Sequence, residues 1–233
     1  MIKFHGLNKL SLVDYPEHMS AILFTGYCNF RCPFCHNSSL VLDPESQGVL
    51  DNDEILSFLR KRKNMLDGVV ITGGEPTVHE DLLDFIKQVK ELGYLVKLDT
   101  NGALPSRLAS LIDSGCIDYI AMDIKNSLDA YARTIGVSGF DTSVIETSVR
   151  MIKESGIDYE FRTTVVKELH YEENFEKICA LIAPCSRYFL QTFVPSEDTI
   201  EKNLSAPDKD AMKNYLKLVK NYITDAYIRD SRD

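Results

Sequence analysis

Residues 21–35 read AILFTGYCNFRCPFC. The apolar run before Gly26 predicts a buried strand, and Cys28, Cys32 and Cys35 follow it with the spacing C-x3-C-x2-C. Iron–sulfur clusters are commonly held by four cysteine thiolates. Three thiolates with no fourth nearby would leave one iron without a protein ligand, so a reactive iron–sulfur cluster is the leading interpretation of this stretch.

Two other kinds of site share part of this pattern. A C-x2-C pair is often half of a structural zinc site, and His36, next to Cys35, is a candidate for its fourth ligand. A C-x-x-C pair in a cytosolic protein is also typical of a thioredoxin-like redox site. The cysteine spacing by itself leaves these alternatives open.

Composition and charge limit the class of protein. The chain has 233 residues, 44% of them hydrophobic, which fits one α/β-barrel-like domain or two small ones. The 26 basic and 35 acidic residues give a formal net charge of −9, which argues against a nucleic-acid partner because phosphate binding depends on clustered Lys and Arg. The chain has no stretch of about 20 apolar residues and no apolar signal-peptide core near its first residue, so we expect a cytoplasmic protein without a membrane partner. The remaining cysteines, Cys116, Cys179 and Cys185, form no ligand-like group and are expected to be small core residues.

Apolar runs alternate with amphipathic segments along almost the whole chain. The predicted strands are 21–26, 68–72, 94–98, 117–122, 157–166 and 188–194. The predicted helices are 51–63, 80–92, 105–114, 142–155, 172–183 and 207–224. Strands that alternate with helices in this way predict repeated βα units and a parallel sheet.

Polar residues recur at or near the carboxyl ends of these strands. They are Cys28 to Cys35 after the first strand, Gly73-Gly74-Glu75-Pro76 after the second, Asp99 and Thr100 after the third, Asp123 and Lys125 after the fourth, Arg162 and Thr163 within the fifth, and Gln191 near the end of the sixth. In βα barrels and wound sheets the carboxyl ends of the strands meet on one face, where sites are built. The sequence therefore predicts an enzyme with its site at that face.

With these residues together, the chain resembles the radical S-adenosylmethionine (SAM) enzymes over nearly its whole length. More narrowly, it is similar to the activating enzymes of glycyl radical enzymes. The segment Gly6-Leu7-Asn8-Lys9-Leu10-Ser11-Leu12-Val13-Asp14-Tyr15-Pro16 and the run Cys35-His36-Asn37 are similar to the activators of anaerobic ribonucleoside-triphosphate reductase. In two places this chain departs from that branch, because Glu17 and Tyr27 stand where glycine is usual.

The resemblance implies a fold and a domain organisation. The implied fold is α/β, a partial (β/α)6 TIM-like barrel that is open on one side, so that a loop of a protein substrate can enter. We expect one radical SAM domain over 1–233, with an N-terminal extension at 1–19, the barrel core at 20–195 and a C-terminal helical segment at 196–233.

The resemblance also implies roles for individual residues. Cys28, Cys32 and Cys35 would bind a [4Fe–4S] cluster, Phe34 would lie against the adenine of SAM, and Gly73, Gly74 and Glu75 would meet the amino group of its methionine. Asp99, Thr100, Asp123 and Lys125 match positions near the SAM ribose and carboxylate, and Arg162 matches a residue that pairs with the carboxylate. For Asp99, Thr100 and Asp123 a monovalent cation stands as an alternative to a plain Asp–Lys ion pair. For Arg162 the alternative is an interior ion pair with Asp99 or Asp123.

The implied activity is radical chemistry rather than acid–base catalysis. The iron without a protein ligand binds SAM, one electron cleaves it, and the resulting 5′-deoxyadenosyl radical removes a hydrogen atom from a glycine of a partner enzyme. The 37 residues between Cys35 and Gly73 contain no cysteine for a further cluster, so an external one-electron donor such as flavodoxin or ferredoxin is expected. The alternatives are the activation of another glycyl radical enzyme, of the pyruvate formate-lyase type, or radical SAM chemistry on a small molecule.

Overall fold

The computed structural model describes residues 2–229. These residues form two compact units, each of which is described by itself. The first unit holds residues 2–29, 37–100 and 104–120, and the second holds residues 30–36, 101–103 and 121–229. Because the sequence runs from one unit to the other more than once, the cysteine segment is shared, with Cys28 in the first unit and Cys32 and Cys35 in the second.

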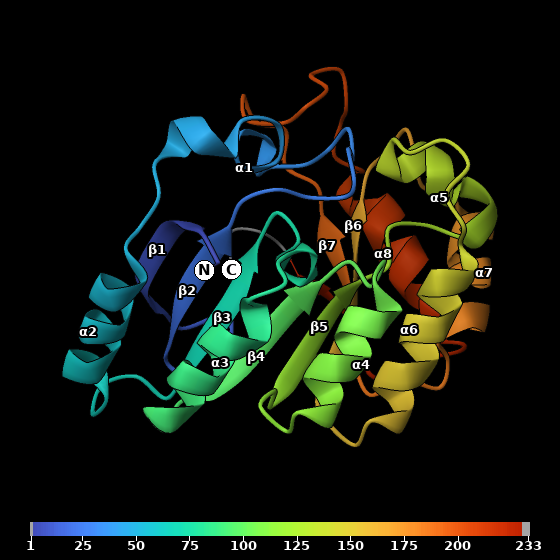
Figure 1. Ribbon diagram of the computed structural model, residues 1–233. Helices are drawn as coiled ribbons and strands as arrows, with labels where there is room; N and C mark the ends of the chain where they lie inside the picture. Colours follow the sequence, from blue (N-terminus) through green and yellow to red (C-terminus); the bar gives the residue numbers. More distant parts are fainter. Residues whose placement is uncertain (1, 230–233) are drawn as a thin grey trace. The chain divides into compact units, whose positions relative to one another are not determined.

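The first unit is built from strands with helices after them. Its elements are β1 (Phe4–Ser11), β2 (Ser20–Thr25), α1 (Ser38–Leu42), the 3-10 helix η1 (Pro44–Gln47), α2 (Asn52–Arg62), β3 (Gly68–Gly73), the 3-10 helix η2 (Pro76–Val78), α3 (Leu82–Glu91), β4 (Leu95–Thr100) and α4 (Pro105–Asp113). Strand β1 pairs antiparallel with β2, whereas β2, β3 and β4 run parallel. Since consecutive crossovers between parallel strands are right-handed, α2 and α3 cover the same face of these strands (Figure 1).

The second unit repeats this alternation. Strand β5 (Tyr119–Asp123) contributes its last residues to it, and its other elements are α5 (Leu128–Ile135), α6 (Ser143–Glu154), β6 (Asp158–Val165), α7 (Glu172–Ile182), β7 (Tyr188–Thr192), α8 (Lys209–Val219) and β8 (Ala226–Arg229). Strand β7 runs parallel to both β6 and β8.

The strands follow the order β1 to β8 in one sheet, with β1 and β8 at its edges. The predicted α/β class with an open, mostly parallel sheet is therefore confirmed, and the six predicted strands correspond to β2 through β7. The six predicted helices correspond to α2, α3, α4, α6, α7 and α8, each within a few residues of its predicted bounds.

Sequence reasoning missed both edge strands and two short helices, α1 and α5. Strand β1 lies in the predicted N-terminal extension, and β8 lies in the predicted C-terminal helical segment. The exposed residues Asn8, Lys9 and Leu10 give β1 no clean apolar alternation, because an edge strand needs apolar side chains on little of its length. The proposed division into extension, barrel core and C-terminal segment stays a prediction. None of the helices within residues 2–229 has the length and apolar character needed to cross a membrane.

Candidate functional site

In the first unit, a tight turn follows strand β3 at Gly73-Gly74-Glu75-Pro76. Gly73 has a φ of +122°, and a Cβ atom there would lie 2.3 Å from the backbone of Thr25. A Cβ atom at Gly74 would lie 1.9 Å from the carbonyl oxygen of Tyr27. Both glycines are needed because the turn presses against the chain that leads to Cys28, and only a residue without a side chain fits.

Hydrogen bonds fix this turn to the end of β2. Gly74 N donates to Thr25 O at 2.9 Å, and Glu75 N donates to Tyr27 O at 2.8 Å. Asn37 Nδ2 donates to Gly73 O at 2.9 Å, so the residue that follows Cys35-His36 also holds the turn. The backbone before Cys28 and the backbone of the Gly-Gly-Glu-Pro turn therefore form one rigid piece of the first unit.

Glu75 is the buried acid of the turn, with 1% of its surface exposed. Its Oε1 accepts hydrogen bonds from Thr77 N at 3.1 Å, Thr77 Oγ1 at 2.5 Å and Thr100 Oγ1 at 2.7 Å. The structure thus brings together the predicted site residues Glu75 and Thr100, and the threonines fix the orientation of the carboxylate. The sequence analysis did not identify Thr77 as a residue that orients Glu75.

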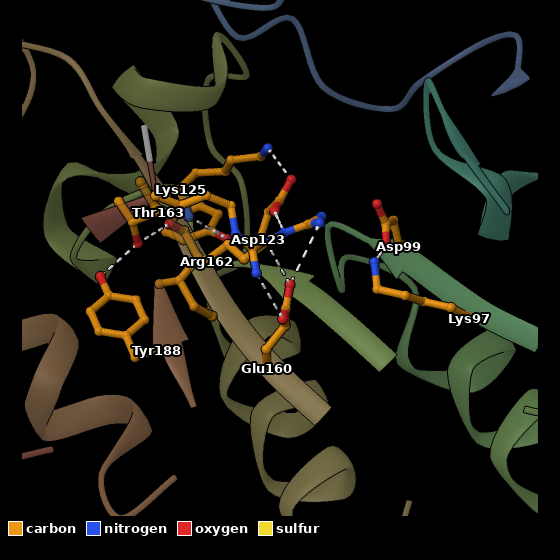
Figure 2. Close-up of polar contacts among 11 residues, drawn as sticks. Lys97, Asp99, Asp123, Lys125, Glu160, Arg162, Thr163 and Tyr188 are labelled. Carbon is orange, nitrogen blue, oxygen red and sulfur yellow. Dashed lines mark hydrogen bonds and ion pairs between the residues drawn. The ribbon is translucent and has the colours of Figure 1, made fainter. Parts of the chain in front are cut away.

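Strand β4 carries an ion pair that sequence reasoning missed. Lys97, with 1% of its surface exposed, places its Nζ 2.5 Å from Asp99 Oδ1 and 5.9 Å from the centre of the Tyr119 ring (Figure 2). A buried lysine needs a counterion, and Asp99 supplies it from two residues further along the strand. The sequence did contain a signal for this ion pair, because Lys97 lies within the otherwise apolar run 95–98.

In the second unit, the cysteine loop is held by its backbone and its aromatic rings. Arg31 N donates to Ile135 O at 2.8 Å, and Glu201 N donates to Pro33 O at 2.8 Å. Phe34, 4% exposed, contacts Phe193 edge-on, with the ring centres 6.5 Å apart. Phe34 therefore packs in the core of this unit, and its contact with SAM stays a prediction.

Cys32 and Cys35 lie at one turn of this loop, where Cys35 N donates to Cys32 O at 3.0 Å. Burial raises the pKa of the Cys32 thiol to about 11, while the nearby Lys125 ammonium acts in the opposite direction and favours the thiolate. Within residues 2–229, no three His, Cys, Asp or Glu side chains are grouped so as to hold a metal ion. The three-cysteine ligand set therefore stays a prediction.

A cluster of charged side chains lies at the ends of β5 and β6. Asp123 accepts a hydrogen bond from Arg162 Nε at 2.8 Å on one oxygen and from Lys125 Nζ at 2.9 Å on the other (Figure 2). Burial opposes ionisation of Asp123, but the charges of Arg162 and Lys125 outweigh it and hold the pKa of this carboxyl well below its usual range. The structure thus joins Asp123, Lys125 and Arg162, and the interior ion pair of Arg162 with Asp123 is present.

Neighbouring residues extend this cluster and fix its frame. Thr163 Oγ1 donates to Ile124 O at 2.7 Å and accepts from Tyr188 OH at 2.7 Å (Figure 2). Glu160, which sequence reasoning did not select, lies 3.9 Å from Arg162 and binds Arg229 of strand β8. Gln191 pairs with Thr164 and Arg229 in the strand register, at the carboxyl end of β7 as predicted.

The two departures from glycine have a backbone consequence. Glu17 has a φ of +65° and Tyr27 a φ of +60°, and they are the only non-glycine residues with positive φ within residues 2–229. At both positions the backbone adopts the left-handed conformation that glycine accepts without strain. The structure therefore explains why glycine suits these positions, although this chain uses other residues there.

Comparison with known proteins places the chain in a family. The family model described as the radical SAM superfamily matches residues 22–182. The chain belongs to the radical SAM superfamily. This radical SAM chain is also 33% identical, over 96% of its length and 94% of the relative, to a Methanocaldococcus jannaschii protein named "Putative glycyl-radical enzyme activating enzyme".

Solved structures of low sequence identity share the fold of this radical SAM enzyme. A domain of the pyruvate-formate lyase-activating enzyme from Bacteroides vulgatus has a TM-score of 0.57 at 19% identity, over 70% of this chain and 98% of that one. Streptococcus suis SuiB bound to its precursor peptide SuiA has a TM-score of 0.69 at 19% identity, over 89% of this chain and 48% of that one.

The residues present fit the cofactors that the superfamily implies, a [4Fe–4S] cluster and SAM. Thiolates are the usual ligands of such a cluster, and none of Cys28, Cys32 and Cys35 is in a disulfide. Arg162 and Lys125 are suited to the carboxylate of an amino acid. A monovalent cation has no such support, because Asp99 is paired with Lys97 and Asp123 with Lys125 and Arg162.

Proposed function

We propose that this radical SAM enzyme activates a glycyl radical enzyme, and that its partner is an anaerobic ribonucleoside-triphosphate reductase. The observation that carries the first part is the match to the M. jannaschii protein along nearly the full length of both chains. The second part rests on the segment from Gly6 to Pro16 and on Cys35-His36-Asn37.

In this proposal Cys28, Cys32 and Cys35 hold the [4Fe–4S] cluster, and SAM contacts Phe34, Gly73, Gly74, Glu75, Asp99, Thr100, Asp123, Lys125 and Arg162. When bound, the two groups together supply a 5′-deoxyadenosyl radical that removes a hydrogen atom from the partner's glycine. The electron comes from an external donor such as flavodoxin or ferredoxin.

The chain's own residues supply binding and orientation. Thr77 and Thr100 hold the Glu75 carboxylate in one orientation, so that it can accept a hydrogen bond from an ammonium group without rearranging. Asp123 accepts a hydrogen bond from Arg162 Nε, and Arg162 Nη1 lies 3.9 Å from Glu160 Oε1. A guanidinium held in one orientation by these acids is suited to meet a ligand carboxylate. No general acid or base is required.

The segment Gly6–Pro16 runs antiparallel to β2, from Gly6 opposite Phe24 at the carboxyl end of that strand to Ser11 opposite Ser20 at its amino end. Within the first unit, Tyr15 packs against Gly68 at the start of β3, and Met19 O accepts hydrogen bonds from Asp67 N and Gly68 N at 2.8 and 3.2 Å. Cys28 follows the other end of β2, and a strand of that length spans about 20 Å. In our proposal the Ser11–Pro16 end of this segment therefore acts in docking the partner and not at the reacting glycine.

The cluster is tested by reconstitution under anaerobic conditions. We expect about four iron and four sulfide per chain, with the cluster lost on serine substitution of Cys28, Cys32 or Cys35. Serine at Cys116, Cys179 or Cys185 is the matched control and is expected to leave the iron content unchanged. One zinc per chain with no iron uptake would contradict the cluster.

The partner is tested by electron paramagnetic resonance of the reduced, SAM-loaded protein mixed with the reductase. A doublet signal that requires both SAM and reductant supports the proposal. A signal that forms only with a formate-lyase-type partner contradicts the choice of partner. SAM cleavage with no radical on either protein would favour the alternative, a small-molecule substrate.

A further inference from the structure

Glu160 is a nearly fully buried carboxylate in the second unit, with 1% of its surface exposed. Two guanidinium groups flank it. Arg229 Nη1 and Nη2 donate to Glu160 Oε1 and Oε2 at 3.1 and 3.3 Å, whereas Arg162 Nη1 lies 3.9 Å from Glu160 Oε1. Figure 2 shows Glu160 and Arg162 on β6, two residues apart and therefore on the same face of the strand.

Arg229 comes from the edge strand β8 and is itself held in place. Its guanidinium carbon lies 3.8 Å from the centre of the Phe189 ring, a distance at which a guanidinium group stacks on an aromatic face. Gln191 is its register partner on the adjacent strand. The guanidinium group of Arg229 is therefore held in a fixed orientation in which it binds both carboxylate oxygens of Glu160.

The two arginines compete for one buried acid. A buried carboxylate that loses its partner becomes strongly unfavourable and draws the nearest cation. Without Arg229, that cation is Arg162, which lies at ion-pair distance from Glu160 and donates its Nε hydrogen to Asp123 at 2.8 Å. A shift of Arg162 onto Glu160 would turn its guanidinium away from Asp123 and Lys125.

We propose that Arg229 is a positioning residue for SAM: by binding both oxygens of Glu160, it keeps Arg162 on Asp123 in the orientation that receives the ligand's carboxylate. The inference rests on the proposed role of Arg162 in binding SAM. It gives β8 a part in cofactor recognition, although Glu160 and Arg229 are 69 residues apart in the sequence.

The test is the affinity of SAM for iron-reconstituted protein, measured by equilibrium dialysis. Arg229→Gln is expected to weaken binding about tenfold, a coupling of the size found between neighbouring charged side chains. Glu160→Gln is expected to stay within about threefold of the parent, because it removes the charge that attracts Arg162. The double variant Glu160→Gln, Arg229→Gln should return to within about threefold of the parent.

The double variant separates positioning from general damage to β8. Loss of β8 packing would weaken SAM binding in both variants that lack Arg229, whereas positioning predicts that only the single variant is weak. Arg229→Lys keeps the charge and should recover part of the affinity. Lys177→Gln, which breaks an exposed ion pair with Asp129 in the same unit, is the matched control and should bind SAM like the parent.

Parental affinity in Arg229→Gln would overturn the inference, and so would a double variant as weak as that single variant. Arg162→Gln is measured alongside, and parental affinity there would refute both the inference and the assigned role of Arg162. If the affinity pattern holds but no partner acquires a glycyl radical, the positioning role stands and the proposed substrate fails.

Discussion

The Gly73–Pro76 turn and the Asp123–Arg162 cluster are both predicted to bind SAM, yet they are built in different ways. The turn depends on close backbone contact, since a Cβ atom at Gly74 would lie 1.9 Å from Tyr27 O. The cluster depends on paired charges, with Asp123 between Arg162 and Lys125 at 2.8 and 2.9 Å. The turn therefore tolerates almost no added volume, whereas the cluster tolerates changes of shape but not of charge.

The two regions should therefore respond differently to substitution. Added volume at the turn should disrupt folding whatever the pH, because the clash is with backbone atoms. Loss of charge in the cluster should cost less, because Asp123 and Lys125 are partly exposed, at 28% and 16% of their side-chain surfaces. Its cost should also depend on pH.

The largest expected effect is that of Gly74→Ala. The new methyl group would overlap the carbonyl of Tyr27, so we expect the apoprotein to lose about 3 kcal/mol or more of unfolding free energy, measured by urea denaturation. Gly115→Ala is the control, because a Cβ atom added there would meet no other atom within 4 Å, and its cost comes only from the positive φ of Gly115, which Gly74 lacks. Its expected cost is about 1 kcal/mol. Equal losses at both positions would contradict the steric account of the turn.

Asp123→Asn should destabilise the protein by about 2 kcal/mol near neutral pH, a value reduced for partial exposure from that of a fully buried pair. The pKa of Asp123 is lowered in the folded state, so its contribution is present above the unfolded pKa of about 3.9 and is lost as the pH falls further. Urea denaturation at pH 6 and at pH 3 measures both effects. The difference between parent and variant should shrink at the lower pH, and an unchanged difference would contradict the ionised pair.

Glu75→Gln tests whether the turn also depends on charge. The amide oxygen can still accept from Thr77 and Thr100, so only the charge assistance is lost and the expected cost is about 1 kcal/mol. Glu168→Gln, a change to an acid that accepts from Ser205 in the second unit, is a comparable control. A loss at Glu75 as large as that expected for Gly74→Ala would mean that charge, and not volume, limits the turn.

The smallest expected effect is a gain. Glu17 is exposed and has a φ of +65°, so Glu17→Gly should relieve backbone strain and, after the entropy cost of glycine, stabilise the protein by about 0.5 kcal/mol. Thermal unfolding measures it. Glu176→Gly, in the exposed interior of α7, should instead destabilise by about 1 kcal/mol. If Glu17→Gly instead destabilises the protein, the Glu17 side chain contributes more to the free energy of unfolding than the strain of its backbone removes.

The fold could be predicted where hydrophobic periodicity is strong and local. The strands β2 through β7 and their long helices were found because buried parallel strands and amphipathic helices leave short-range patterns in the sequence. Strand β1 was missed because its exposed residues break the apolar alternation, and β8 because it has only four residues and is stabilised by β7, which is distant in the sequence. The helix α5 was missed because its eight residues form a short pattern.

The candidate site divides in the same way. The sequence by itself determined the cysteine spacing, the two glycines of the turn and the polar residues at the strand ends, since each reflects a local demand for ligands, a left-handed φ or close backbone approach. Only the tertiary structure decided which charges pair. Sequence reasoning selected none of Lys97, Glu160 and Arg229; folding buries Lys97 and Glu160 and pairs them with Asp99 and Arg229. Burial makes an unpaired charge costly, and the partner that satisfies it is chosen by strand neighbours in space and not by spacing in the sequence.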